Sequence, residues 1–79
     1  MFTVYVLRSL KDPENYYVGL TTDLDARLKD HNEGKSGHTL KYRPWEVIVT
    51  VNFKDQQKAE EFERHLKSGS GRAFCIRHF

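Results

Sequence analysis

Five side chains of this 79-residue chain have the chemistry needed to act on a phosphate ester. They are two phenols, a guanidinium, an imidazole and a carboxylate: Tyr5, Tyr17, Arg27, His31 and Glu63. A guanidinium matches phosphate oxygens bidentately, and an imidazole or a phenol can take a proton from water. Mg²⁺ prefers oxygen ligands and often takes only one or two carboxylates, with water and substrate phosphate completing its shell. If the fold gathers them, the five suit phosphodiester hydrolysis.

The guanidinium and the imidazole belong to one predicted helix. The sequence predicts this helix from about Asp23 to Asn32, with Thr22 as its N-cap and Gly34 as its stop. Arg27 and His31 lie one turn apart within it, so both project from the same side.

That side is the apolar one. At about 100° per residue, Arg27 and His31 fall on or beside the stripe formed by Leu24 and Leu28. Two interpretations are open. The arginine can extend along the helix to solvent while the histidine is a hydrogen-bonded core residue, or both can face a functional cleft.

The carboxylate lies on a second predicted helix. Asp55 caps this helix, which runs through about Lys67. Glu63 is the one glutamate of the helix beside its apolar stripe, next to Leu66 on the wheel. The alternative to a functional carboxylate is a salt bridge from Glu63 to Arg27 or to a lysine.

The two tyrosines belong to a predicted hairpin. Residues 2–10 and 16–20 are rich in β-branched and aromatic residues, and the short polar segment between them predicts an antiparallel pair. If Tyr5 lies opposite Tyr17, the turn centres near Lys11 and both rings project from one face. The alternative is that both tyrosines simply pack against the sheet.

A third strand is predicted over residues 45–53, with strict alternation through Val47, Val49 and Val51. The "SGSG" segment is expected to break the chain after the second helix. Residues 72–79 are predicted as one or two helical turns, with Phe74 available for packing.

The predicted fold class is α/β. The order is strand, strand, helix, strand, helix and a short C-terminal helix, which predicts a small sandwich with a three-stranded antiparallel sheet and flanking helices. The length predicts a single domain over residues 1–79. Whether one face of the sheet stays open to solvent or to a ligand is not decided by the pattern.

Composition sets outer limits on the function. Hydrophobic residues make up 38% and charged residues 30%, a balance typical of globular proteins, and the net charge of +2 permits a nucleic-acid partner without requiring one. Cys75 is the only cysteine, which excludes an intramolecular disulfide. No apolar run approaches the roughly 20 residues of a membrane span. We therefore expect a cytoplasmic protein without a membrane partner.

Five basic residues are candidate contacts to a nucleic-acid backbone. They lie in the glycine-containing loop over residues 33–44 and around "SGSG": Lys35, Lys41, Arg43, Lys67 and Arg72. Such contacts would be salt-sensitive and independent of base sequence. An ordinary solvated surface is an equally weighted alternative, because the net charge is small.

Four segments resemble the GIY-YIG nuclease superfamily. "TVY" (residues 3–5) resembles the GIY element and "YVG" (17–19) the YIG element. "GLTTDLDARLKDHN" (19–32) and "AEEFERHLKSGSGRAF" (59–74) are similar to the helices of small single-domain members, which themselves resemble the N-terminal domain of the excinuclease nuclease. Each tyrosine motif is unspecific alone, but their order is specific. The chain departs from the family name only by Thr3 for glycine and by valines for the isoleucines.

The resemblance implies a role for each of the five side chains. Tyr5 and Tyr17 would orient or deprotonate the nucleophilic water. Arg27 would stabilise the transition-state charge, and His31 would assist as a base or phosphate ligand. Glu63 would hold a single Mg²⁺ or Mn²⁺ ion. Gly19 would keep the backbone close to the site.

The function that the resemblance implies is a divalent-metal-dependent endonuclease cleaving DNA, with repair or recombination as the setting. A protein partner could supply specificity, because a chain of this length has little room for a targeting domain. The first alternative is a non-catalytic nucleic-acid-binding module of the same fold, and the second is an interaction protein without a nucleic-acid role.

Overall fold

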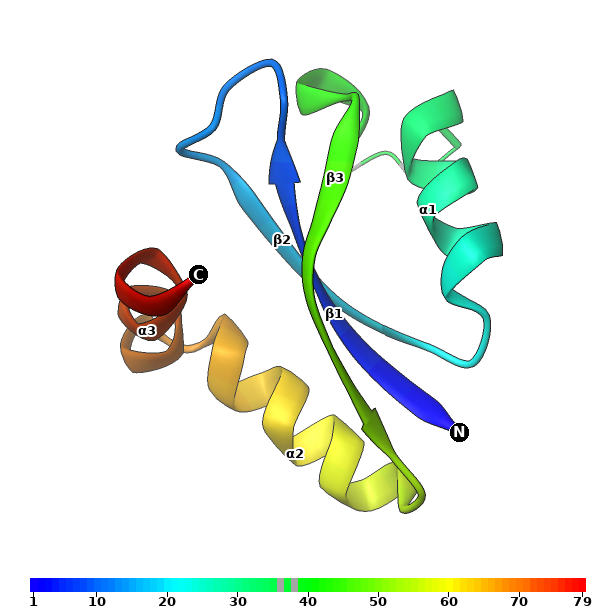
Figure 1. Ribbon diagram of the computed structural model, residues 1–79, viewed down its shortest axis with the longest axis vertical. Coiled ribbons are helices and arrows are strands. Elements are labelled where there is room, and N and C mark those ends of the chain that lie inside the picture. The colour runs from blue at the N-terminus through cyan, green and yellow to red at the C-terminus, as the bar shows by residue number, and fades with distance from the viewer. Residues whose placement is uncertain (36, 38) are drawn as a thin grey trace.

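The fold is a central sheet with helices on both faces. The structure is a computed structural model and describes residues 1–35, 37 and 39–79. In chain order its elements are β1 (Phe2–Ser9), β2 (Tyr16–Thr21), α1 (Leu24–Glu33), the 3₁₀ turn η1 (Leu40–Tyr42), β3 (Trp45–Phe53), α2 (Gln56–Lys67) and α3 (Gly69–His78). Helix α1 lies on one side of the sheet, and α2 and α3 lie on the other (Figure 1). The predicted α/β sandwich is confirmed, and neither face is left open.

The sheet is antiparallel with strand order β2-β1-β3. The central strand β1 is the most buried, because it has neighbours on both edges and helices on both faces. Tyr5 and Leu7 point toward α1, whereas Val4 and Val6 belong to the core under α2 and α3. One strand thus contributes to two separate cores.

The predicted strict alternation of β3 is wrong. The register between β1 and β3 shifts at Val6/Leu7, so that Val6 pairs with Val49 while Leu7 pairs with Val47. The extra residue of this β-bulge reverses the side on which later residues point. Val47 therefore packs on the α1 side and Val49 on the α2 side.

Helix α1 begins one residue later than expected. Asp23, not Thr22, is its N-cap, and the Asp23 carboxylate accepts a hydrogen bond from the backbone N–H of Ala26 at 3.1 Å. Gly34 ends the helix as predicted, in the left-handed conformation with φ of 79°, which a glycine adopts at little cost.

Helices α2 and α3 are joined by a single residue. Asp55 caps α2 as predicted, and Ser68 both ends α2 and caps α3. The "SGSG" segment is therefore the first turn of α3 and not an extended break. Phe74 is 43% exposed, and Cys75 is the α3 residue that packs in the core. Among the described residues, no helix is long and apolar enough to cross a membrane.

Candidate active site

Tyr5 is positioned by its strand partner Gly19. The two residues face each other across β1 and β2, so the predicted pairing of Tyr5 with Tyr17 is wrong by two residues. A Cβ atom on Gly19 would collide with the Tyr5 ring at Cζ and Oη. The glycine of "YVG" thus provides the space into which the tyrosine of "TVY" extends.

Tyr17 lies on the same face as Tyr5, as predicted. It pairs with Leu7, and the ring centroids of the two tyrosines are 6.3 Å apart. The Tyr17 ring is 4.8 Å from the His31 ring, centroid to centroid. Tyr5 is only 1% exposed, whereas Tyr17 is half-buried, so Tyr17 is the more accessible of the two phenols.

His31 is fully buried between the sheet and the loop that follows α1. Its exposed fraction is 0%. Its Nε2 lies 3.0 Å from the Tyr5 hydroxyl, and its Nδ1 lies 2.7 Å from the hydroxyl of Thr39. Both ring nitrogens are therefore partnered, and a buried imidazole of this kind can transmit the position of one neighbour to another.

Thr39 was not predicted as a site residue. It lies in the segment expected to be a loop, is 0% exposed, and its carbonyl accepts a hydrogen bond from Trp45 Nε1 at 2.9 Å. No periodicity marks a loop residue as buried, so only a partner search around His31 would have indicated it.

Arg27 is the partly exposed member of the group. Its side chain is 39% exposed and lies 3.9 Å from the Asp30 carboxylate on the same helix. Its guanidinium is also within hydrogen-bonding reach of the Tyr5 hydroxyl, an interaction that together with burial shifts the pKa of Tyr5. Arg27 thus extends to the solvent boundary while remaining attached to the buried phenol.

The electrostatics keep this group protonated in a defined way. Burial raises the pKa of the Tyr5 phenol; the Arg27 hydrogen bond opposes that rise, and the nearby charges of Tyr17 and Glu63 add to it. Burial, with the positive charge of Arg27, lowers the pKa of His31, and only Asp30 opposes this. At neutral pH Tyr5 is therefore a neutral phenol and His31 a neutral imidazole.

Glu63 lies on the other face of the sheet. It is carried by α2, and its side chain is 21% exposed, as expected for a residue beside the apolar stripe. Its carboxylate pairs with Lys67 at 3.2 Å, so the lysine form of the predicted salt bridge is the one that exists. Its charge nevertheless acts on Tyr5, and it lines an open pocket with Leu20 of the edge strand β2.

The structure thus gathers four of the five predicted side chains into one cluster and places the fifth nearby. Tyr5, Tyr17, Arg27 and His31 share the α1 face. Glu63 approaches the same region from α2, across the free edge of β2. In the described part of the chain, no three His, Cys, Asp or Glu side chains group closely enough to hold a metal ion.

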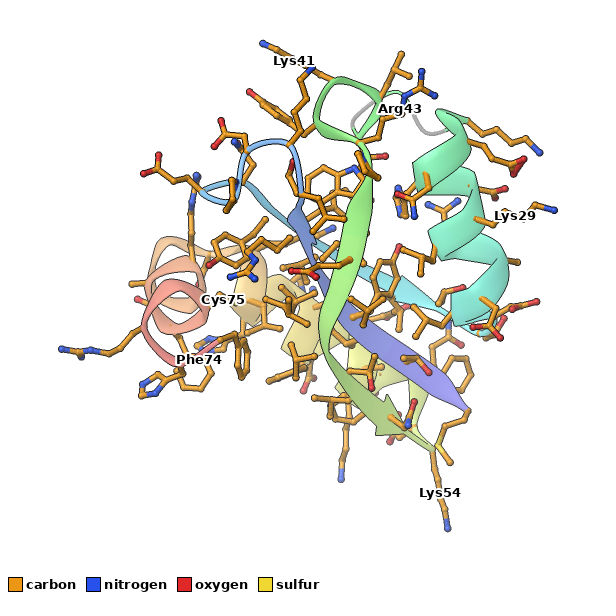
Figure 2. All side chains as sticks on the ribbon, turned by 45° about the horizontal axis from the view of Figure 1, so that its top comes forward. Lys29, Lys41, Arg43, Lys54, Phe74 and Cys75 are labelled. Carbon is orange, nitrogen blue, oxygen red and sulfur yellow. The ribbon has the colours of Figure 1, made fainter. Side chains whose placement is uncertain are left out.

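The predicted nucleic-acid contacts are all exposed and fall into two groups. Lys35, Lys41 and Arg43 follow α1, and Figure 2 shows Lys41 and Arg43 at one end of the molecule, far from Lys54 at the other. Lys67 and Arg72 line a groove of about 260 Å³ beside β2, whose lining also includes Tyr17.

Comparison with known proteins identifies relatives of two kinds. Residues 1–74 match the family model of the GIY-YIG catalytic domain. The structure-specific endonuclease subunit SLX1 of Debaryomyces hansenii is 37% identical over 83 residues, covering 85% of this chain and 24% of that protein. The UPF0213 protein YazA of Bacillus subtilis is 37% identical over 54 residues, covering 67% of this chain and 54% of that protein. The chain spans about a quarter of the length of the first relative.

A solved structure shows the same fold over almost the whole chain. The solution NMR structure of the UPF0213 protein BH0048 from Bacillus halodurans superposes with a TM-score of 0.57 and 28% identity, covering 98% of this chain and 84% of that one. With the family match over residues 1–74, this confirms the resemblance drawn from the tyrosine motifs. The chain belongs to the GIY-YIG catalytic domain family.

Proposed function

We propose that the chain is the catalytic module of a divalent-metal-dependent endonuclease that hydrolyses phosphodiester bonds in DNA. The observation that carries the proposal is the cluster of Arg27 with Tyr5, Tyr17 and His31, beside the carboxylate of Glu63. A guanidinium at the solvent boundary, anchored by a buried phenol, is suited to bind two oxygens of a scissile phosphate.

Exposure divides the roles within the cluster. Tyr5 and His31 are buried and Arg27 and Tyr17 are not, so contact with the substrate falls to Arg27 and Tyr17. The pKa of Arg27 is raised further by its hydrogen bond to Tyr5, which keeps the guanidinium charged for a phosphate. Tyr17 supplies a hydroxyl that can orient the attacking water, and Tyr5 and His31 support the cluster from within.

The residues present fit a single bound cation such as Mg²⁺ or Mn²⁺. Glu63 offers one partly exposed carboxylate next to an open pocket, and Mg²⁺ is commonly held by one or two carboxylates together with water and substrate phosphate. When bound, such an ion would supply charge stabilisation at the phosphate and the leaving oxygen. Lys67, which pairs with Glu63, would have to turn away, and it could then contact the DNA backbone.

The relatives support a substrate recognised by shape. The SLX1 proteins are named structure-specific endonuclease subunits, and phosphate contacts from exposed lysines and arginines carry no base-sequence information. We therefore propose branched DNA as the substrate class, repair or recombination as the setting, and a protein partner that completes specificity. The two exposed cation groups, Lys41 with Arg43 and Lys67 with Arg72, are the proposed backbone contacts.

The decisive experiment compares two glutamates of one helix. Glu63→Gln should abolish cleavage of branched DNA in Mg²⁺, while Glu61→Gln, at an exposed position of α2, should cleave like the wild type. Both variants should have wild-type melting temperatures, because neither glutamate supports the core. Undiminished cleavage by folded Glu63→Gln would overturn the role of this carboxylate.

The ion pair of Glu63 with Lys67 gives a second candidate some support. A carboxylate engaged at 3.2 Å by a lysine is compatible with a module that binds nucleic acid without cutting it. Salt-dependent binding of the wild type to branched DNA without any cleavage, in either Mg²⁺ or Mn²⁺, would favour this function over the nuclease.

A further inference from the structure

A buried hydrogen-bonded chain runs from Thr39 to the solvent boundary. Thr39 Oγ1 contacts His31 Nδ1 at 2.7 Å, and His31 Nε2 contacts the Tyr5 hydroxyl at 3.0 Å. The Tyr5 hydroxyl in turn interacts with Arg27. Thr39, His31 and Tyr5 are at most 1% exposed, so Arg27 is the only member that a substrate can reach.

The proton positions along this chain follow from the Arg27 end. A guanidinium can only donate hydrogen bonds, so the Tyr5 oxygen must accept from Arg27. The phenol hydrogen is then directed to His31 Nε2, which has to be unprotonated. Because the imidazole is neutral, its single hydrogen is on Nδ1 and is donated to Thr39 Oγ1.

We propose that Thr39 is a positioning residue that fixes the His31 hydrogen on Nδ1, so that the Tyr5 oxygen presents its lone pairs to Arg27. This inference deepens the proposed nuclease function and rests on it. In the other tautomer, His31 Nε2–H would donate to the Tyr5 oxygen. The phenol hydrogen would then turn toward the Arg27 guanidinium, which cannot accept it. Arg27 would lose the acceptor that orients it toward phosphate.

Thr39 itself is held in place independently of His31. Its carbonyl accepts the Trp45 indole N–H at 2.9 Å. The Trp45 backbone is bound by Asn32, whose side chain accepts from the Trp45 N–H at 2.6 Å and donates to the Trp45 carbonyl at 3.2 Å. The backbone of the loop is therefore anchored to β3, and a change of the Thr39 side chain can be expected to alter the chain without displacing the loop.

The direct test reads the His31 tautomer by long-range ¹H–¹⁵N NMR of the imidazole. The wild type and Thr39→Ser should show a protonated Nδ1 and a bare Nε2. Thr39→Val, which has nearly the same shape but no hydroxyl, should show a shift toward protonated Nε2. A wild-type imidazole protonated on Nε2 would overturn the inference, and so would a Thr39→Val imidazole unchanged from the wild type.

The functional test is a double-mutant cycle with Arg27. Thr39→Val should lower the cleavage rate of branched DNA by about ten- to a hundredfold, the cost of a misplaced catalytic group, and Thr39→Ser should restore it. In an Arg27→Ala background, Thr39→Val should cost nothing more. An equal loss in both backgrounds would show that Thr39 does not act through Arg27.

The two proposals fail in different ways. If the wild type cleaves no DNA in Mg²⁺ or Mn²⁺, the nuclease function fails while the tautomer is still measurable. If the wild type cleaves and carries the wrong tautomer, the positioning role fails while the nuclease function stands. A melting temperature of Thr39→Val measured beside Thr39→Ser separates loss of fold from loss of orientation.

Discussion

The imidazole of His31 is neutral in the folded chain because water is kept away from it. Burial is the main cause of its lowered pKa, and the charge of Arg27 acts in the same direction. Asp30 opposes the shift from the same helix, while Tyr5 and Thr39 contact the two ring nitrogens. A proton that the unfolded chain takes up readily is thus taken up with difficulty by the folded one.

This difference predicts how stability depends on pH. Above the ordinary histidine pKa of 6.5, neither state binds a proton at His31, and the site contributes no pH dependence. Below 6.5 the unfolded chain is protonated first, so the free energy of unfolding falls until the folded pKa is passed. Urea unfolding at about pH 7.5 and about pH 5.5 should show this fall.

Two measurements isolate the contribution of His31. Replacement of the exposed His65 by glutamine should leave the fall in stability between the two pH values intact. An NMR titration of the His31 ring should give a pKa below 6.5. A ring that titrates at or above 6.5 would contradict the prediction, whatever the stability curve shows.

At the scale of the elements, caps and helices were more predictable than strand register. Asp55 and Gly34 were identified from sequence because a cap depends on a few adjacent residues. The hairpin register and the bulge in β3 were not, because both depend on how strands meet across the sheet.

The site was predictable to the same extent. Wheel positions placed Arg27 and His31 on the inner side of α1, and Glu63 beside the stripe of α2. The contact between His31 and Thr39 is fixed by the path of a loop that no pattern describes. Likewise, only the observed register shows that Gly19 faces Tyr5.

The junction of α2 and α3 yields a prediction about two neighbouring glycines. A Cβ atom on Gly71 would collide with the backbone carbonyl of His65 and would lie 2.5 Å from Leu66 Cα, whereas one on Gly69 meets nothing within 4 Å. Gly71→Ala should therefore lower the free energy of unfolding by about 1–3 kcal/mol. Gly69→Ala should be neutral or slightly stabilising. Equal effects in urea unfolding would show that the helices are not held this closely.

At the scale of the whole molecule, the cations are distributed unevenly. Lys41 and Arg43 lie at one end and Lys54 at the opposite end (Figure 2), while the net charge is only +2. Binding to DNA should therefore depend on where a charge lies rather than on how many charges there are.

Charge-neutralising variants test this dependence. Lys41→Gln and Arg43→Gln should each weaken DNA binding and reduce the slope of log affinity against log salt by about one. Lys54→Gln removes the same charge at the distant end and should change neither the affinity nor the slope. Equal losses from all three variants would indicate attraction by net charge alone.

The amide of Asn32 has a consequence for how the two layers hold together. By bonding both the N–H and the carbonyl of Trp45, the side chain imitates one peptide unit of a neighbouring strand. Helix α1 is thereby paired to the sheet as if it supplied one rung of a further strand. That rung closes the start of β3 to pairing with another chain. It also fixes the helix that carries Arg27 and His31 to the sheet that carries the tyrosines.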